Sequence, residues 1–167
     1  QIKKWVRKQL RSMTIEEKVG QMTQINIGVL IDKKVKGRVA FDEEKMAEAF
    51  DKYKVGSVLN SISRALTLSE WHDVINAVQD KALSSEQAIP VLYGVDAIHG
   101  VTYTQGSTLF PHNIGLAASR DLSLVKQATK ATAMEVRATG VRWNFDPVLD
   151  AGRNPLWSRF EETFGED

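Results

Sequence analysis

Apolar and polar positions along the chain follow two periods, which together predict helices separated by short strands. A period of about 3.6 residues is typical of helices, whereas alternation or a short unbroken apolar run is typical of strands. We predict helices over residues 1–22, 42–53, 69–82 and 121–140, and strands over residues 22–27, 55–60, 89–96 and 141–148. This order favours a parallel sheet with helical crossovers, either doubly wound or closed as a β/α barrel.

Cap residues indicate where several helices begin and end. After an interruption of the first helix, Thr14 and Glu17 have the spacing of a capping box, in which each side chain bonds the other residue's backbone amide. Ser69 and Asp121 are the predicted N-caps of the two later helices. Gly140 is expected to end the last helix, because glycine readily adopts the left-handed backbone required there.

The apolar stripes predict which side chains face the core. They comprise Ile15, Val19, Met22, Met46, Ala49, Phe50, Tyr53, Trp71, Val74, Ile75, Val78, Ala82, Leu124, Val125, Ala128, Ala131 and Val136. The stretch from Gly100 to Gly115 follows neither period and is predicted to be a loop. A loop of that length in a compact domain is typically functional or disordered.

The apolar run over residues 89–96 is the expected central strand, and it ends on Asp96. An unbroken apolar run is typical of a parallel strand that is covered on both faces. The carboxyl end of such a strand lies at the edge where α/β proteins place their chemistry, so Asp96 is a candidate functional residue. The alternative is that its carboxylate caps the next turn by accepting from the amide of Ile98 or His99.

Composition excludes several classes of protein. The 167 residues are 43% hydrophobic, enough for one domain with a sizeable core. The balance of 22 basic and 21 acidic residues gives no sign of a nucleic-acid partner. No apolar run approaches the roughly 20 residues of a membrane span, and no signal peptide begins at Gln1, although secretion stays open.

Motifs for common cofactors and nucleophiles are absent from the sequence. There is no cysteine, no G-x-G-x-x-G or Walker loop after a strand, and no G-x-S-x-G elbow. His72, His99 and His112 lack the spacing of a metal site, and we expect each to be structural. The sequence therefore predicts neither a metal nor a cofactor.

The stretch from residue 144 to residue 167 leaves the last strand and becomes polar, aromatic and dense in charge, with arginine beside tryptophan and carboxylates. Guanidinium groups and carboxylates bond vicinal hydroxyls, and indole rings cover the apolar faces of sugars. The composition is thus typical of a site for a polyhydroxylated ligand. An ion-paired loop that stiffens a barrel rim is the alternative.

Several blocks of the chain, in the right order, resemble the amino-terminal domain of family 3 glycoside hydrolases. They are residues 13–22, 95–100, 110–116, 133–140 and 145–167. The resemblance implies an α/β fold of the (β/α)8 TIM-barrel type. Residues 1–167 would form roughly the first half of that barrel, without its remainder or the second α/β sandwich domain.

The resemblance also implies an activity and the residues that serve it. The intact protein would hydrolyse terminal non-reducing β-D-glucosyl residues by a retaining mechanism. Asp96 and Arg159 match the residues that hold the terminal sugar. The nucleophile and the acid/base are expected beyond residue 167, so this segment contains no catalytic residue and is predicted to be inactive alone. Two departures lie beside Arg159, because Asn154 replaces the usual aspartate and Ser158 the frequent glycine.

Alternatives and partners complete these expectations. Xylosidase-like members usually carry glutamate where this chain has Asp96, so we favour a β-glucosidase over a β-xylosidase or another exo-glycosidase of the family. A non-catalytic carbohydrate-binding fragment is the third hypothesis. We expect a β-glucoside or oligosaccharide as the partner, together with the rest of the hydrolase or a second copy at the open sheet edge. The expected location is periplasmic or secreted.

Overall fold

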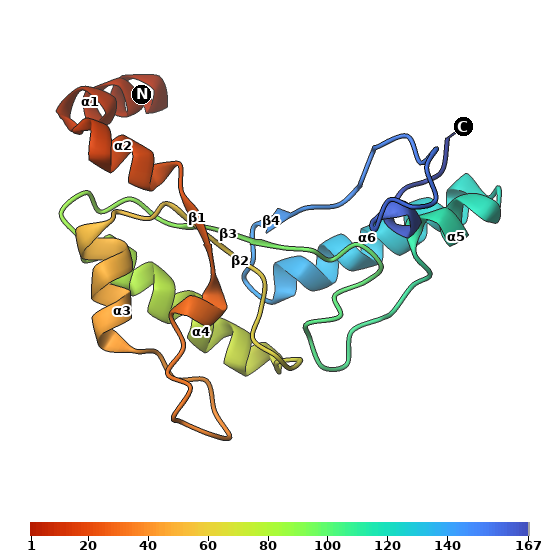
Figure 1. Cartoon of the computed structure of the whole chain (residues 1–167), viewed down its shortest axis with the longest axis horizontal. Helices are drawn as coiled ribbons and strands as arrows, with labels where there is room; N and C mark the ends of the chain where they lie inside the picture. Colours follow the sequence, from red (N-terminus) through yellow and green to blue (C-terminus); the bar gives the residue numbers. More distant parts are fainter. Residues whose placement is uncertain (167) are drawn as a thin grey trace. The chain divides into compact units, whose positions relative to one another are not determined.

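The computed structural model describes residues 1–166, so the last block of the resemblance is described up to Glu166. The chain forms two compact units (Figure 1). The first contains Gln1–Leu59 and Asn76–Leu92, and the second contains Asn60–Ile75 and the residues from Tyr93 onward. The boundary between the units crosses a helix and a strand, and each unit is described by itself.

The first unit contains two parallel strands with helical segments before and between them. Its elements are α1 (Ile2–Ser12), α2 (Ile15–Gln21), β1 (Gln24–Asn26), η1 (Ile27–Val29), α3 (Glu43–Ala47), the π-helical η2 (Glu48–Lys52), β2 (Ser57–Leu59) and the second half of α4 (Leu68–Leu83). Gln24 pairs with Ser57 in the ladder of β1 and β2. The Leu92 amide donates to the Gly56 carbonyl at 3.0 Å. The predicted parallel pairing is therefore observed in this unit.

The second unit repeats the parallel arrangement. It contains the first half of α4, most of β3 (Leu92–Val95), α5 (Asn113–Ala118), α6 (Leu122–Ala138), β4 (Trp143–Asn144) and η3 (Phe160–Glu162). Gly94 pairs with Trp143 and Val95 with Asn144 in a parallel ladder. On the other side, the Asn60 amide donates to the Gly94 carbonyl at 2.8 Å.

Helix ends follow the cap residues in most cases. Thr14 and Glu17 form the predicted capping box. The Asp121 carboxylate accepts from the first amides of α6, and Gly140 follows that helix with a φ of 91°. Ser69 was the wrong cap, because Thr67 occupies that role: its hydroxyl accepts from the Glu70 amide. The Glu70 carboxylate bonds the Thr67 amide in return at 2.9 Å.

Other predicted boundaries also differ from the structure. The central strand predicted over residues 89–96 is shorter, because β3 spans only Leu92–Val95. The strand predicted over residues 141–148 is reduced to β4, because Pro147 has no amide to continue a ladder. The loop predicted to reach Gly115 ends earlier, where α5 begins at Asn113. The α5 helix contacts both α6 and η3 (Figure 1).

The core contains most of the predicted apolar side chains. In the first unit the largest buried ones include Ile27, Leu30, Phe50, Val58 and Val78, and in the second they include Leu66, Trp71, Val74, Val95, Val101 and Val141. Several predictions were wrong, because these side chains are exposed: Ile15, Val19, Met22, Tyr53, Leu124 and, in the central strand, Leu92. Periodicity identifies an apolar face but not whether a neighbour within the described residues covers it. No helix within residues 1–166 is long and apolar enough to cross a membrane.

The α4 cap gives a direct test of local stability. Replacing Thr67 by alanine removes an N-cap acceptor and should lower the free energy of unfolding by about 1 kcal/mol. Ser69→Ala is the matched control, since Ser69 makes no cap bond, and its effect should stay within about 0.5 kcal/mol. Urea denaturation of both variants measures the difference. A larger loss for Ser69→Ala would restore Ser69 as the cap.

The same cap predicts a pH dependence of stability. Hydrogen bonds from Arg64, followed by the bond from the Thr67 backbone, lower the pKa of Glu70 to about 2 from its ordinary value of 4.5. A lowered folded-state pKa stabilises the protein above the unfolded pKa, and this contribution is lost as the pH falls toward 2. The stability difference between the protein and Glu70→Gln should therefore be constant above about pH 5 and shrink between 4.5 and 2. A difference independent of pH would contradict this.

Candidate functional site

Asp96 directly follows β3 in the second unit, at the carboxyl end of the strand. Its carboxylate makes no hydrogen bond to the Ile98 or His99 amide among the described residues, so the turn-capping alternative is not observed. The turn is held instead through Ala97. The Asn144 side chain, at the end of β4, accepts from the Ala97 amide at 2.9 Å and donates to the Ala97 carbonyl at 3.3 Å.

Arg159 directly precedes η3 as its N-cap residue and is paired with the carboxylate of Glu162. The Arg159 Nε and Nη2 atoms lie 2.7 and 2.5 Å from the same oxygen, Glu162 Oε2. This hydrogen bond is the main reason that the pKa of Arg159 is raised, and the charges of Glu162, Asp96 and Asp150 raise it further. The structure therefore places Asp96 and Arg159 within electrostatic reach of each other, although 63 positions separate them in the sequence.

Tyr103 extends this group of charged side chains. It belongs to the long loop that begins at Gly100, and it is partly buried. Burial raises the pKa of the Tyr103 hydroxyl, and the negative charges of Asp96 and Glu162 raise it further. One phenol, one guanidinium and two carboxylates thus influence one another electrostatically. All can exchange hydrogen bonds with sugar hydroxyls.

Beneath these groups, the side-chain amide of Asn113 connects the ends of two segments. Asn113 is 1% exposed, and its Nδ2 donates to Asp146 Oδ1 at 3.0 Å and to the Glu162 carbonyl at 2.9 Å. Asp146 lies just past β4. Burial raises the pKa of its carboxyl, while the bond from Asn113 lowers it. The amide thereby ties the segment that carries Arg159 to the carboxyl end of β4.

The two departures beside Arg159, Asn154 and Ser158, do not disturb the backbone of the loop. The Asn154 amide oxygen accepts from the Leu156 amide at 3.0 Å, as a carboxylate at this position would. Ser158 has no left-handed backbone, so glycine is not required there. The loop is also closely packed on Thr163, which is 0% exposed. A Cβ at Gly152 would lie 2.3 Å from the Thr163 hydroxyl.

The three histidines contact backbone carbonyls or each other. His72 Nε2 lies 2.8 Å from the Ala138 carbonyl oxygen, and His99 Nδ1 lies 3.2 Å from that of Phe110. The rings of His99 and His112 are 4.2 Å apart between centroids. Within residues 1–166, no group of His, Asp and Glu side chains has the arrangement of a metal site.

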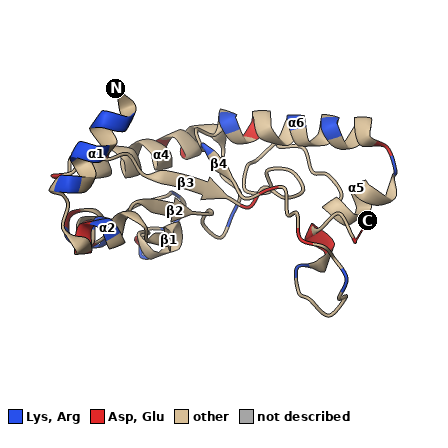
Figure 2. Cartoon of the chain, turned by 90° about the horizontal axis from the view of Figure 1, so that it is seen from above, with Lys and Arg blue, Asp and Glu red and all other residues tan. Residues whose placement is uncertain are grey.

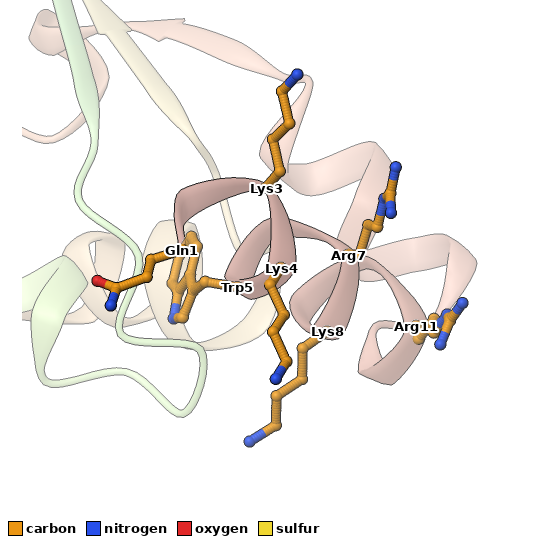
Figure 3. Close-up of a pocket in the computed structure, with 7 residues that line it drawn as sticks. All are labelled: Gln1, Lys3, Lys4, Trp5, Arg7, Lys8 and Arg11. Atoms are coloured by element: carbon orange, nitrogen blue, oxygen red, sulfur yellow. The ribbon is translucent and has the colours of Figure 1, made fainter.

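Two of the hollows formed by residues 1–166 are relevant to the search for a site, and neither includes Arg159. One, of about 840 Å³, runs along α1 in the first unit and is lined mainly by cations and Trp5 (Figure 3). Lys and Arg occur on α1 without any Asp or Glu (Figure 2). A second hollow, of about 590 Å³, lies between α6 and the segment around β4, where Asn144 and Asp146 contribute to its wall. Of the two, only the second reaches residues that support the candidate site.

Sequence reasoning missed Tyr103, Asn113, Asp146 and the partner role of Glu162. Asp146 was missed because it lies inside the strand predicted over residues 141–148, whereas the observed strand β4 already ends at Asn144. Glu162 lies three residues after Arg159, a spacing that allows pairing across one helical turn. Nothing in the sequence distinguishes the amide of Asn113 from other polar groups in its loop.

Comparison with known families and curated proteins gives consistent results. Residues 14–167 match the glycosyl hydrolase family 3 N terminal domain. The chain is 40% identical over 167 residues to a lysosomal beta glucosidase of Dictyostelium discoideum, covering 95% of this chain and 20% of the relative. It is 30% identical over 159 residues to a periplasmic beta-glucosidase of Salmonella typhimurium, covering 95% and 18%. The chain thus spans about a fifth of the length of these relatives.

Solved structures show the same likeness. An exo-1,3/1,4-beta-glucanase from a Pseudoalteromonas species superposes with a TM-score of 0.77 at 37% identity, covering 98% of this chain and 20% of that one. A beta-glucosidase from Listeria innocua in complex with isofagomine gives a TM-score of 0.72 at 30% identity, with coverages of 98% and 20%. The predicted fold class, α/β of the (β/α)8 TIM type with roughly the first half present, is confirmed.

Replacing Asn113 by alanine tests the buried connection. The change leaves the Glu162 carbonyl and one oxygen of Asp146 without their donor, which should lower the free energy of unfolding by about 2–3 kcal/mol. Gln127→Ala is the control, because that amide is exposed on α6 and its loss should cost less than about 0.5 kcal/mol. Chemical denaturation compares the two variants. Equal losses would show that Asn113 does not hold the segment.

Proposed function

The chain belongs to glycosyl hydrolase family 3, and on that premise we propose that it supplies part of the sugar-binding subsite of an exo-acting β-glucosidase. The intact enzyme removes terminal non-reducing β-D-glucosyl residues from β-glucosides or oligosaccharides with retention of configuration. Residues 1–167 are the amino-terminal portion of its barrel domain. The remaining β/α units and a second α/β sandwich domain lie outside this sequence.

One observation carries the proposal, namely that the charge of Asp96, just past the carboxyl end of β3, contributes to the raised pKa of Arg159. A glucosyl residue presents vicinal hydroxyls, each of which both donates and accepts hydrogen bonds. The Asp96 carboxylate accepts from hydroxyl groups, and the Arg159 guanidinium donates to them. Hydrogen bonds to ionised groups are stronger than those between neutral groups, so this pair suits the terminal sugar of an exo-acting enzyme.

The chemistry at the anomeric carbon needs groups that this segment does not supply. Retaining hydrolysis requires two carboxyl groups about 5–5.5 Å apart across the scissile bond, one as nucleophile and one as acid/base. We place both beyond residue 167. Asp96 and Arg159 hold the sugar in its ground state, and binding of that kind alone does not lower the barrier. The segment by itself is therefore inactive.

Location and partners follow from the same proposal. The two curated relatives are named as lysosomal and periplasmic enzymes, which supports a periplasmic or secreted location. The substrate is the main partner. Apolar side chains of α1 and α2, such as Trp5 and Val19, are exposed. Their exposure supports a further partner, either the rest of the hydrolase or a second copy of the chain that pairs at an open sheet edge.

Substitution of Asp96 by asparagine in the intact enzyme tests the proposal. The fold should persist, but one charge-assisted hydrogen bond worth about 1.5–3 kcal/mol is lost. We expect kcat/KM for an aryl β-glucoside to fall by roughly 10- to 150-fold. Asp73→Asn, which alters an exposed carboxylate on α4, should leave the kinetics unchanged. Unchanged kinetics for Asp96→Asn would contradict the proposed role of Asp96. Separately, greater activity of the unaltered enzyme on the matched aryl xyloside than on the glucoside would favour a β-xylosidase.

A further inference from the structure

We infer that Glu162 is a positioning residue that fixes the orientation of the Arg159 guanidinium for the sugar. This inference rests on the proposed function, because it assumes that Arg159 binds the substrate. Glu162 itself need not touch the sugar. It acts through the two short contacts that Arg159 Nε and Nη2 make with Glu162 Oε2.

Arg159 needs such a partner because its own surroundings do not immobilise it. Its side chain is 49% exposed, whereas that of Glu162 is 14% exposed. A long, half-exposed arginine side chain has many accessible rotamers, and holding it in one of them costs conformational entropy. Because the carboxylate of Glu162 already holds the guanidinium in one orientation, the conformational entropy of Arg159 is lost before the substrate binds and does not weaken substrate binding.

Glu162 is the anchored member of the pair. Its carbonyl accepts from the buried Asn113 amide at 2.9 Å, and its own amide donates to the Arg159 carbonyl at 3.1 Å. The next residue, Thr163, is fully buried and bridges in parallel to Val148. The backbone of Glu162 is thus fixed from both sides, and its carboxylate is a defined reference point for the guanidinium.

The geometry leaves one edge of the guanidinium for a ligand. Because Nε and Nη2 both face Glu162, Nη1 is the nitrogen that makes no hydrogen bond within the described residues. The group is planar, so fixing two nitrogens also fixes the direction in which the Nη1 hydrogens point. Asp96 lies within electrostatic reach of the same group. Glu162 therefore sets how donor and acceptor are arranged around a sugar hydroxyl.

The test uses the intact enzyme and four variants: Glu162→Gln, Arg159→Ala, the double variant and Glu161→Gln. Glu161 is the matched control, since it lies next to Glu162 in η3 but is exposed and forms no ion pair within residues 1–166. We expect kcat/KM for an aryl β-glucoside to fall about tenfold in Glu162→Gln, and not to change in Glu161→Gln. In the Arg159→Ala background, Glu162→Gln should cause no further loss, because a residue that acts only through its partner is not additive with it.

A second readout separates positioning from a general loss of structure. The penalty of Glu162→Gln should be present with the parent glucoside and disappear with at least one monodeoxy analogue, the one that lacks the hydroxyl bound by Arg159. A purely structural defect would lower activity on all analogues equally. Thermal denaturation identifies a variant that does not fold, and in that case Glu162→Asp, which keeps the charge but shortens its reach, replaces it in the same series.

The outcomes separate the proposed sugar-binding role of Arg159 from the inferred positioning role of Glu162. If Arg159→Ala leaves kcat/KM unchanged, the proposed sugar-binding role itself fails. If Arg159→Ala is impaired but Glu162→Gln is not, or if the losses of the two variants add in full, Arg159 keeps its role and the positioning inference is overturned. Loss in Glu162→Gln that is absent in the Arg159→Ala background supports the inference.

Discussion

The candidate site depends on the buried amide of Asn113. That single NH2 group donates both to the carboxylate of Asp146, just past β4, and to the backbone of Glu162 in η3. The segment after β4 is otherwise irregular, and its two leucine side chains, Leu149 and Leu156, are exposed, whereas Val148 is buried. Apolar burial therefore accounts for only part of what holds the segment in place. A hydrogen bond donated from a buried side chain fixes it because the alternative, an unsatisfied buried polar group, is costly.

The charges around Arg159 suit a neutral ligand. Asp96, Asp150 and Glu162 each stabilise the protonated guanidinium, so the cation is never left unpaired when the site is empty. A sugar carries no charge to replace those partners, and under the proposed function its hydroxyl groups would be inserted among them. Parallel strands make this arrangement possible, because their carboxyl ends bring Asp96 and the loop after β4 to the same edge.

Local signals in the sequence predicted local structure well. The predicted cap residues Thr14, Asp121 and Gly140 are found at the expected helix ends. These predictions succeed because capping depends only on neighbours within one turn. Ser69 failed since Thr67 offers the same hydroxyl with Glu70 at the reciprocal position. Burial of Val19 and Leu124 was predicted wrongly, because periodicity identifies an apolar face but not whether a neighbour within the described residues covers it. The hydrogen bonds of Asn113 could not be predicted either, because they join Asn113 to residues 33 and 49 positions away, and no local sequence pattern indicates such contacts.

The most direct measurement of the central claim is a crystal structure of the intact enzyme with glucose bound. We expect a glucosyl ring at the carboxyl end of β3, with hydroxyl groups within hydrogen-bond distance of both the Asp96 carboxylate and the Arg159 Nη1 atom. Glu162 should remain paired with Arg159 and make no contact with the sugar. A ring bound elsewhere, or bound with neither Asp96 nor Arg159 in reach, would contradict the proposed site.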